Sequence, residues 1–434
     1  MRTSPPSEER VRLPASNPHG LSLLVVRDGR IVDADGRPVY LRGFQGLGFY
    51  PIPADFFLRA VWEHGIDPTR FDDHALDLSR YTLTQFDLDE IRSTGANVVR
   101  LWVHLHEIQR PHGQYSQRAL ELLERTVGRF GEAGIYVVLV LGTAAQNTYV
   151  ESEFYTQRGL SLWDRGDGFW EQTLGAWRVL ARRFAGNPYV AGYDVINEPD
   201  PPSRKALHAY YRDAIAAIRG QDGGHIIFLA VAEHNEHTYQ VGGRHLDANV
   251  ATTFHFYYPH DFTLEPRVPG LTYPGSYDFC LPGTDRRDCG RTWWTRRTLE
   301  RIFEVALHLD ELRGGPILVG EFGAHAVRDG SGGRQWIRDV MSIMDERGLH
   351  YTFHNYKHRD FQGYWIMKPE VKERVETALA RVAAGNLEYG QVTDEQKSLL
   401  TTQRGFYRRP GIKEILTSHF GGSLGRSQKS DPYP

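Results

Sequence analysis

Two glutamates stand where a carboxylate would project from the end of a buried strand. Glu198 follows the apolar pair Val195–Ile196 and precedes Pro199, which cannot continue the hydrogen bonds of a strand, and Glu321 ends the run Ile317–Gly320. Two such carboxyl groups can cleave a glycosidic bond, because one protonates the leaving oxygen while the other attacks the anomeric carbon. The chemistry needs one group protonated and the other ionised. Either glutamate alone is equally well explained by a structural ion pair or a helix cap.

Three further residues have the chemistry to separate the two pKa values. Arg100 follows the apolar pair Val98–Val99 and is a cation that can keep Glu321 ionised by Coulomb attraction. Tyr257 can donate its phenol proton to the same carboxylate, and His255 can orient or tune the other one. Each of these residues also has a structural explanation, as an ion pair at a strand end or as part of the core. Their joint occurrence favours a site.

Short apolar runs alternate with amphipathic helical segments, and this alternation indicates βα repeats and a parallel sheet. Eight runs are predicted as strands: Val39–Phe44, Val98–Val103, Tyr136–Leu141, Val190–Ile196, Ile226–Val231, Ala251–Tyr257, Ile317–Glu321 and Tyr351–Asn355. Helices are predicted at Asp87–Thr94, Gln117–Ala133, Trp170–Phe184, Ser203–Ile218, Thr292–Leu312 and Arg334–Glu346, and beyond the last strand at Glu370–Ala384, Asp394–Thr402 and Gly411–His419. A β-hairpin at Leu24–Val32, with its turn at Asp35–Gly36, is expected to close the bottom of a barrel.

Polar residues cluster at the carboxyl ends of the predicted strands. They are Arg100, Asn197 with Glu198, His255 with Tyr257, Glu321, and His354 with Asn355. In a (β/α)8 barrel these ends converge on one face, where the active sites of this fold form. The number of runs alone also suits a doubly wound open sheet, but the polar clusters favour the barrel. We therefore predict an α/β protein of the (β/α)8 TIM-barrel class with long βα loops.

Composition agrees with one large globular unit. The 434 residues are 40% hydrophobic and 24% charged. The formal net charge of -3 lacks the positive excess that is typical of proteins that bind nucleic acid. No run approaches the roughly 20 apolar residues that cross a bilayer. We expect residues 1–17 to be a disordered lead-in, residues 18–420 to form a single catalytic domain, residues 421–434 to be a flexible tail, and the chain to act as a monomer.

Neither a compartment nor a cofactor is indicated by the sequence. The segment Met1–Asn17 lacks the apolar core of a secretory signal, so secreted and cytoplasmic locations both stay open. Cys280 and Cys289 fit a short disulfide and two free thiols equally well. No cofactor and no metal are expected, because two cysteines make a structural zinc site improbable and the group at 234–237, His234, Glu236 and His237, reads as ordinary loop or helix-start residues.

With these residues in view, the chain resembles glycoside hydrolase family 5, the cellulase-like retaining barrel glycosidases. Five segments match in the family's order between about residues 24 and 366: Tyr40–Phe44, Gly95–Arg100, Val195–Pro199, His255–Pro259 and Val319–Gly323. The resemblance implies that Glu198 is the acid/base and Glu321 the nucleophile. It also implies that Asn197 binds the substrate 2-hydroxyl, that Arg100 and Tyr257 hold the nucleophile, and that His255 lies beside the acid/base.

Two departures from the family's pattern concern the floor of the sugar pocket. Members often carry His at the end of the third strand, where this chain has Val140–Thr143, and many carry Trp at the end of the eighth, where it has His354 beside Asn355. Aromatic side chains outside the strands are candidate platforms for sugar rings. The candidates are Tyr149, Tyr155 and Trp163 after the third strand, Trp293 and Trp294 before the sixth helix, and Trp365 after the eighth strand.

The expected substrate is a carbohydrate, and the leading prediction is an endo-β-1,4-glucanase. The same family includes enzymes that cleave mannan, β-1,3-glucan or glycosylceramides, and the long insertions at 142–168 and 258–291 are compatible with an exo-acting β-glucosidase. A catalytically inactive carbohydrate-binding barrel is the alternative of a different class.

Overall fold

Eight parallel strands close into a barrel in which neighbours follow chain order. The computed structural model describes residues 17–49, 69–110, 113–142, 161–232, 246–264, 270–279, 290–307, 315–325, 330–358, 363–374, 377 and 393–421. The barrel strands are β3 (Arg42–Gly48), β4 (Val98–His104), β7 (Tyr136–Gly142), β8 (Val190–Asp194), β9 (Ile226–Ala230), β10 (Val250–Phe256), β13 (Ile317–Phe322) and β14 (His350–His354). All eight predicted strands and the (β/α)8 barrel are confirmed.

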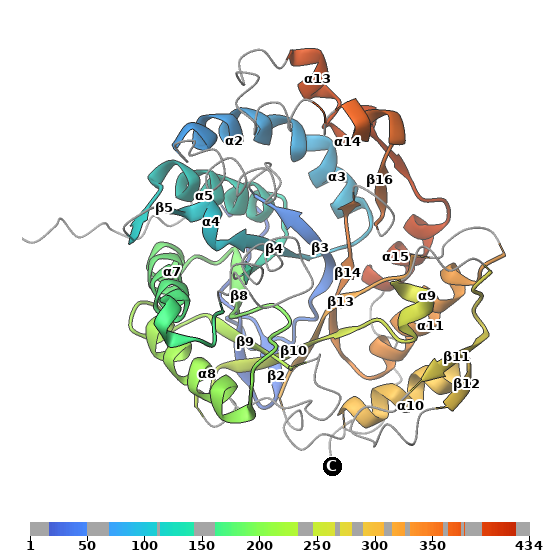
Figure 1. Ribbon diagram of the computed structural model, residues 1–434. Coiled ribbons are helices and arrows are strands. Elements are labelled where there is room, and N and C mark those ends of the chain that lie inside the picture. The colour runs from blue at the N-terminus through green and yellow to red at the C-terminus, as the bar shows by residue number, and fades with distance from the viewer. Residues whose placement is uncertain are drawn as a thin grey trace, which may run out of the picture.

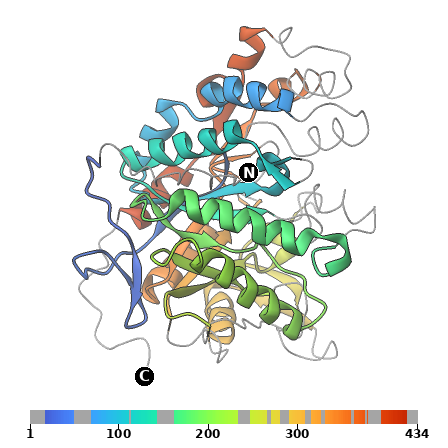
Figure 2. The same cartoon turned by 90° about the vertical axis from the view of Figure 1, so that its left-hand side faces the viewer.

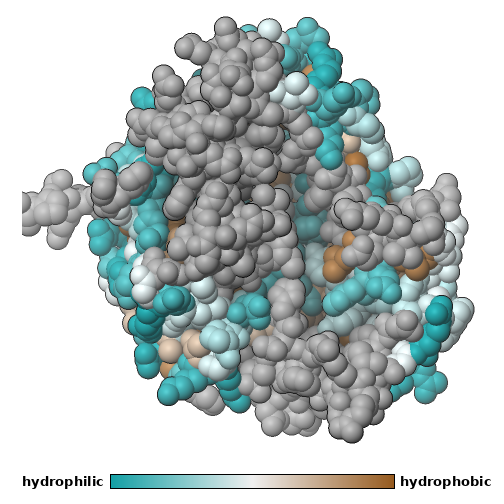
Figure 3. All heavy atoms as spheres, in the orientation of Figure 1, coloured by the Kyte–Doolittle hydropathy of each residue, from teal (hydrophilic) through white to brown (hydrophobic). Residues whose placement is uncertain are grey.

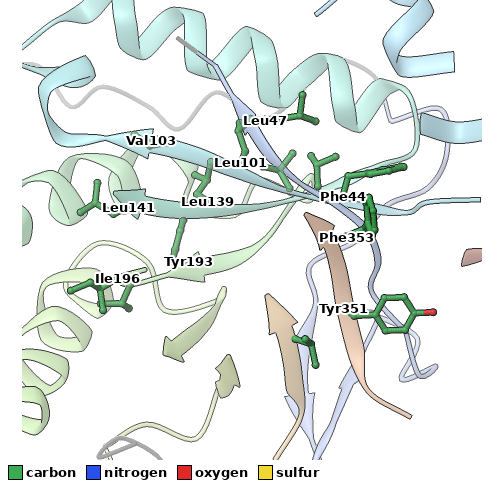
Figure 4. Close-up of a cluster of buried hydrophobic side chains, with 14 of the residues drawn as sticks. Phe44, Leu47, Leu101, Val103, Leu139, Leu141, Tyr193, Ile196, Tyr351 and Phe353 are labelled. Atoms are coloured by element: carbon green, nitrogen blue, oxygen red, sulfur yellow. The ribbon is translucent and has the colours of Figure 1, made fainter. Parts of the chain in front are cut away.

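Strict alternation along β4 divides its side chains between the barrel interior and the surrounding helices. Val99, Leu101 and Val103 belong to the large apolar core that the helices share. Figure 4 shows Leu101 and Val103 beside Leu139 and Leu141 of the neighbouring strand β7. The residues between them, Val98, Arg100, Trp102 and His104, therefore face the interior, and they run from the bottom of the barrel to its mouth.

Helices surround the barrel and pack their apolar faces onto it (Figure 1). The longer ones are α2 (Thr69–Thr82), α3 (Gln85–Ser93), α5 (Gln117–Glu132), α7 (Phe169–Phe184), α8 (Arg204–Arg219), α10 (Arg296–Leu307), α11 (Gly333–Glu346) and α15 (Ile412–Phe420). Short helical turns are α4 (Leu105–Ile108), η2 (Arg165–Asp167), α9 (His260–Thr263), α13 (Asp394–Ser398) and α14 (Thr402–Gly405). No described helix is both long and apolar enough to cross a bilayer.

Two helix predictions are wrong at their boundaries. Residues predicted to open the helix at Thr292 instead form β12 (Gly290–Trp294), which pairs antiparallel with β11 (Gly275–Phe279) before α10 begins. Pairing in a two-stranded ribbon exposes Trp293 and buries Trp294, an alternation that a helix would not produce. The helix predicted at Asp394–Thr402 stops at Ser398, and α14 then begins at Thr402.

The N-terminal hairpin lies at the bottom of the barrel, as Figure 2 shows for the blue segment. Its strands, β1 (Val25–Arg27) and β2 (Arg30–Val32), turn at Asp28 and Gly29, so the predicted turn at Asp35–Gly36 is wrong. Asp28 and Gly29 both have positive φ, at 50° and 73°, which the favoured two-residue hairpin turn requires. Asp35–Gly36 makes a second turn, after which Val32 bridges Pro38. Hairpin side chains pack against the amino-terminal ends of the barrel strands.

The C-terminal part closes the helical ring next to the first strand. Phe420 of α15 packs its ring against Phe44 of β3 and Tyr351 of β14, with ring centroids 5.4 Å and 6.1 Å apart. Arg42 donates a hydrogen bond to the carbonyl of His419 at 2.9 Å. The predicted helix at Gly411–His419 is thus confirmed as a helix of the barrel. A small sheet of β15 (Lys357–His358), β16 (Trp365–Met367) and β17 (Phe406–Arg408) lies beside it.

Candidate active site

Arg100 holds three polar groups that come from two barrel strands, β8 with the loop after it and β13. Its Nη1 donates to Glu321 Oε1 at 3.0 Å, its Nε to Asp194 Oδ2 at 2.8 Å, and its Nη2 to Asn197 Oδ1 at 2.8 Å. The side chain is completely buried. A guanidinium has its donors in a rigid plane, so these bonds fix Glu321 and Asn197 relative to one another.

The surroundings of Glu321 favour its ionised form. Burial alone would raise the pKa of this carboxyl, but attraction to His255, His354 and Arg100 outweighs burial. A hydrogen bond from Tyr257 Oη to Oε2 at 2.9 Å acts in the same direction. Together they lower the pKa of Glu321 to about 2. At neutral pH this residue is an anion held by donors on both oxygens.

Glu198 and Glu321 meet at His255. The Nδ1 atom of His255 lies 2.7 Å from Glu198 Oε1 and 3.7 Å from Glu321 Oε2. One oxygen of each glutamate and a ring nitrogen of His255 all lie within 4.8 Å of one another. Retaining glycosidases have carboxyl groups about 5–5.5 Å apart, whereas inverting enzymes need about 6.5–9.5 Å for a water molecule. The short distance between the nearest oxygens agrees with the retaining arrangement.

The backbone at Glu198 is strained. Its φ of 39° is in the left-handed region, which typically costs a non-glycine residue about 1–3 kcal/mol. The strand β8 has ended at Asp194 and Pro199 follows, so the chain changes direction here, and the Glu198 carboxyl reaches His255. Strain of this kind persists only where the surroundings hold it, and here it places a carboxyl group at the mouth of the barrel.

Further polar and aromatic side chains continue the site from Glu321 Oε2 through His354. The Nδ1 atom of His354 lies 3.6 Å from Glu321 Oε2, and the same ring contacts the Gln45 amide. Trp102 Nε1 donates to Gln45 Oε1 at 2.8 Å, which fixes the orientation of that amide. Asn355 is buried next to His354, across a cis peptide bond, and its Oδ1 has no hydrogen-bond partner among the described residues.

The sequence of most of the barrel identifies the family. A sequence model described as cellulase, glycosyl hydrolase family 5, matches residues 66–360, about two thirds of the chain. The chain belongs to glycosyl hydrolase family 5. It is therefore a glycoside hydrolase, as the resemblance of its five motifs implied.

Curated relatives in the family differ in the activities that their names state. A β-xylosidase of Phanerodontia chrysosporium is 27% identical over 79% of this chain and 72% of its own length. Endoglucanase C of Acetivibrio thermocellus is 21% identical over 69% of this chain and 91% of its own. Among solved structures, endo-glycoceramidase II from Rhodococcus sp. aligns with a TM-score of 0.54 at 21% identity, covering 78% of this chain and 77% of that one. That structural likeness shows a shared fold.

The structure brings together the charged and polar residues that the sequence singled out. Asn197, Glu198, His255, Tyr257, Glu321, His354 and Asn355 lie at the carboxyl ends of the barrel strands or in the loops that follow, and Arg100 reaches Glu321 and Asn197 from within β4. In the part of the chain that the structure describes, Glu198, His255 and Glu321 are the one group spaced to share a metal ion. Hydrogen bonds with His255, Arg100 and Tyr257 engage the two carboxyl groups.

Two of the aromatic candidates pack against other aromatic rings. Trp163 packs its ring against Trp170 and Tyr210, with centroids 6.2 Å and 5.9 Å away. Trp365 packs in the same way against Phe86 and Tyr364, at 5.9 Å and 5.8 Å.

The two neighbouring tryptophans of β12 differ in exposure. Trp293 is 61% exposed on a ribbon at the outer edge of the molecule beside α10 (Figure 1), and Trp294 is fully buried. Tyr149 and Tyr155 lie outside the described residues, as do Cys280, Cys289 and the group at 234–237. Trp163 and Trp365 thus pack against other rings, Trp294 is buried, and Trp293 lies at the periphery.

Sequence reasoning missed Asp194, Gln45 and Trp102. Asp194 is a carboxylate inside an otherwise apolar run, four residues before Glu198, and burial raises its pKa. That position was a usable signal, because a charged residue in a buried strand needs a partner. Gln45 and Trp102 carry no such signal, since their hydrogen bond depends on the pairing of β3 with β4.

Proposed function

We propose that this family 5 enzyme hydrolyses β-glycosides by double displacement, with Glu321 as the nucleophile and Glu198 as the acid/base. The observation that carries the proposal is the short distance between the two glutamates, one oxygen of each lying within 4.8 Å of the other, with Glu321 held by the buried guanidinium of Arg100. In the first step Glu321 attacks the anomeric carbon while Glu198 gives its proton to the leaving oxygen. A covalent glycosyl-enzyme and the free aglycone result.

In the second step water completes the reaction. Glu198, now a carboxylate, takes a proton from water as the water oxygen attacks the anomeric carbon. The bond to Glu321 breaks, the sugar leaves with its original configuration, and Glu198 is again protonated. Arg100 and Tyr257 hold the departing carboxylate of Glu321 in place through their bonds to Oε1 and Oε2. His255 orients Glu198 through the hydrogen bond at Oε1.

Asn197 is proposed to bind the sugar 2-hydroxyl. Its Oδ1 accepts from Arg100 Nη2, so the amide plane is fixed and its amino group is directed away from Arg100. A 2-hydroxyl lies next to the anomeric carbon, and hydrogen bonds to it strengthen in the transition state. This contact would favour sugars with an equatorial 2-hydroxyl, as in glucose and xylose.

For the natural substrate we propose a β-1,4-linked glycan of gluco or xylo configuration, with endo-β-1,4-glucanase as the first candidate activity. The Endoglucanase C relative, which this chain matches over most of that protein's length, supports it. A β-xylosidase is the second candidate, because the relative of that name is more similar and covers more of this chain. Neutral sugars also suit a chain of small net charge.

A substrate panel tests this proposal. Wild type and Glu321→Ala are assayed for reducing sugar on soluble β-glucans, xylan, mannan and glycolipids, and for aryl glycoside cleavage. We expect release of oligosaccharides from β-1,4-glucan by wild type and none by Glu321→Ala. Release of xylose alone from chain ends would favour the second candidate. Equal, negligible release by both proteins across the panel would contradict hydrolysis and favour an inactive sugar-binding barrel.

A further inference from the structure

The side-chain amide of Gln45 joins the rings of Trp102 and His354 inside the barrel. Gln45 is completely buried in β3, and His354 is its partner in the pairing of β3 with β14. Trp102 of β4 donates from Nε1 to Gln45 Oε1 at 2.8 Å, and Gln45 Nε2 is hydrogen-bonded to His354 Nδ1. The amide therefore has a ring nitrogen at each end, and its orientation determines what each ring can do.

The chemistry of these groups fixes the proton on His354. An indole N–H can only donate, so the end of the amide that faces Trp102 must be its oxygen. The other end is the NH2 group, which also only donates, so His354 Nδ1 must be an unprotonated acceptor. A neutral imidazole of this kind has its proton on Nε2. An imidazolium would have a proton on Nδ1 as well, facing the NH2 group of Gln45, so this hydrogen bond favours the neutral ring.

Charged and titratable groups of both signs surround the His354 ring. They come from four other parts of the barrel: Glu321 of β13, Glu198 after β8, His255 of β10 with Tyr257 after it, and Arg100 of β4. Burial is the largest effect and lowers the pKa of His354, the two glutamates raise it, and the net pKa lies below the ordinary value. The ring is therefore neutral at neutral pH, and it attracts the Glu321 carboxylate as a cation only at more acid pH.

The charge of His354 matters because of where its ring lies. Its Nδ1 is 3.6 Å from Glu321 Oε2, and the anomeric carbon must approach a Glu321 oxygen to be attacked. In the transition state that carbon has the positive charge of an oxocarbenium ion. An imidazolium in this buried place would repel that charge. It would also stabilise the Glu321 anion before the reaction and so make attack slower.

We propose that Gln45 is a positioning residue whose amide, oriented by Trp102, keeps His354 neutral with its proton on Nε2, so that His354 places no positive charge beside the reacting sugar. The consequence for catalysis rests on the proposed function, because it assumes a sugar that reacts with Glu321. The protonation of His354, in contrast, can be measured without a substrate. Gln45 acts through His354, and its amide neither gives nor takes a proton in the reaction.

The protonation state is tested first, by NMR of the wild-type protein with ¹⁵N-labelled histidine. The signals of His354 are assigned by their loss in His354→Gln. We expect them to show an unprotonated Nδ1 and a protonated Nε2 at neutral pH. A protonated Nδ1, either in the other tautomer or in the imidazolium, would overturn the proposal. This measurement does not depend on the folding of any Gln45 variant.

Gln45→Glu reverses the hydrogen bond to His354. One carboxylate oxygen still accepts from Trp102, and the other accepts from a protonated Nδ1, because imidazole is more basic than a carboxylate. We expect His354 to be an imidazolium at neutral pH and kcat/KM on an aryl β-glycoside to fall about tenfold or more there. As the pH rises and the imidazolium loses its proton, kcat/KM should recover, so the profile gains an acid limb near neutral pH.

Two further variants connect this limb to His354. The double variant Gln45→Glu, His354→Gln has no imidazole at that position, so the new limb should be absent. Gln221→Glu, at an exposed amide that accepts from Arg182 Nε at 2.8 Å, is the matched control and should keep the wild-type profile.

Three results of these variants would contradict the role of Gln45. They are a neutral His354 in Gln45→Glu, an imidazolium there with the wild-type profile, and a loss of kcat/KM that is the same at every pH, as a purely structural role would give. If wild type cleaves no glycoside at all, the proposed function has failed, and the NMR signals still decide the protonation of His354. If wild type is active and its Nδ1 is protonated, this inference alone has failed.

Discussion

Arg100 donates hydrogen bonds to three side chains of the site, those of Asp194, Glu321 and Asn197. Its guanidinium faces two buried carboxylates, Glu321 and Asp194, and one cation cannot balance both. The two respond in opposite directions, because burial raises the pKa of Asp194 while several favourable neighbours lower that of Glu321. Glu321 is therefore the carboxylate that stays ionised across the acid range, as the nucleophile that we propose must.

Removing one hydroxyl tests the electrostatics around Glu321. Tyr257→Phe deletes the bond to Oε2, which should raise the pKa of Glu321 by roughly one to two pH units, the equivalent of about 1.5–3 kcal/mol. Because the nucleophile must be ionised, the acid limb of kcat/KM against pH should move to higher pH. Tyr136→Phe, which removes a hydroxyl bound to Ser22 at the barrel bottom, should leave the profile unchanged. An unmoved acid limb in Tyr257→Phe would contradict this role.

The acid role of Glu198 predicts a dependence on the leaving group. Glu198→Gln should slow cleavage of glycosides with poor leaving groups about 10²–10⁴-fold, and should affect activated aryl glycosides much less, because these need little protonation. The measurement is kcat/KM over a series of aryl glycosides. Glu124→Gln, on α5 and ion-paired with Arg183, is the matched control. A loss of the same size on every leaving group would rule out proton donation by Glu198.

Residue types and their positions after apolar runs were enough to predict three charged residues of the site, although Asp194 was missed. Glu198, Glu321 and Arg100 each follow such a run, and converging strand ends then bring them together. The hydrogen bond between Gln45 and Trp102 could not be predicted, because it depends on the register between β3 and β4. Trp163 shows the converse, since its ring packs against Trp170 and Tyr210, partners that become neighbours only in the fold.

At the scale of elements, the eight strands were predictable because each is a short apolar run between helical patterns. The helix α10 shows the limit, since the residues before it form a strand that exists only through its pairing with β11. The hairpin turn was misplaced for a related reason. Both Asp28–Gly29 and Asp35–Gly36 are good turn sequences, and packing against the barrel bottom decides which one joins β1 to β2.

Two glycines of α5 test how closely a helix must approach the barrel. A Cβ on Gly131 would lie 2.0 Å from Cγ of Tyr189, which is buried just before β8, whereas a Cβ on Gly128 meets nothing within 4 Å. Gly131→Ala should therefore lower the free energy of unfolding by about 1–3 kcal/mol. Gly128→Ala should raise it by about 0.5–1 kcal/mol, because alanine favours helix. Urea denaturation measures the free energy of unfolding of both variants. Equal changes in the two variants would contradict close packing of α5 at Tyr189.

At the scale of the whole molecule, we propose that residues 18–420 form one catalytic domain. The hairpin covers the bottom of the barrel, and α15 packs against the first and last strands, so both ends of the described chain depend on the barrel core. On the face seen in Figure 3, most described residues around the rim are hydrophilic, as expected where a sugar polymer approaches. The core packing could be predicted in outline, because apolar periodicity determines which face of each element is buried.

The dependence of stability on acid pH tests the role of His350, a buried histidine at the amino-terminal end of β14. His350 accepts a hydrogen bond from the Leu41 N–H at 3.0 Å, and burial together with nearby Arg42 lowers the pKa of His350 to about 3. Between pH 6.5 and about 3 the unfolded chain binds a proton that the folded state excludes, so stability should fall as pH falls through this window. His350→Asn keeps an acceptor and cannot be protonated there, so it should flatten this part of the profile.

The measurement for that prediction is urea unfolding at several pH values. The exposed His208 on α8 provides the control, since His208→Asn should leave the slope as in wild type. An equally steep loss of stability in His350→Asn would show that other groups dominate the acid sensitivity.

The most direct test of the whole account is to trap the glycosyl-enzyme. An activated glycoside that wild type hydrolyses is prepared with fluorine at C2, which slows the second step more than the first, and the treated protein is digested and mapped by mass spectrometry. The account predicts one sugar per chain, on the peptide that contains Glu321. A sugar on any other residue, or cleavage that gives an inverted product and leaves the protein unlabelled, would contradict it.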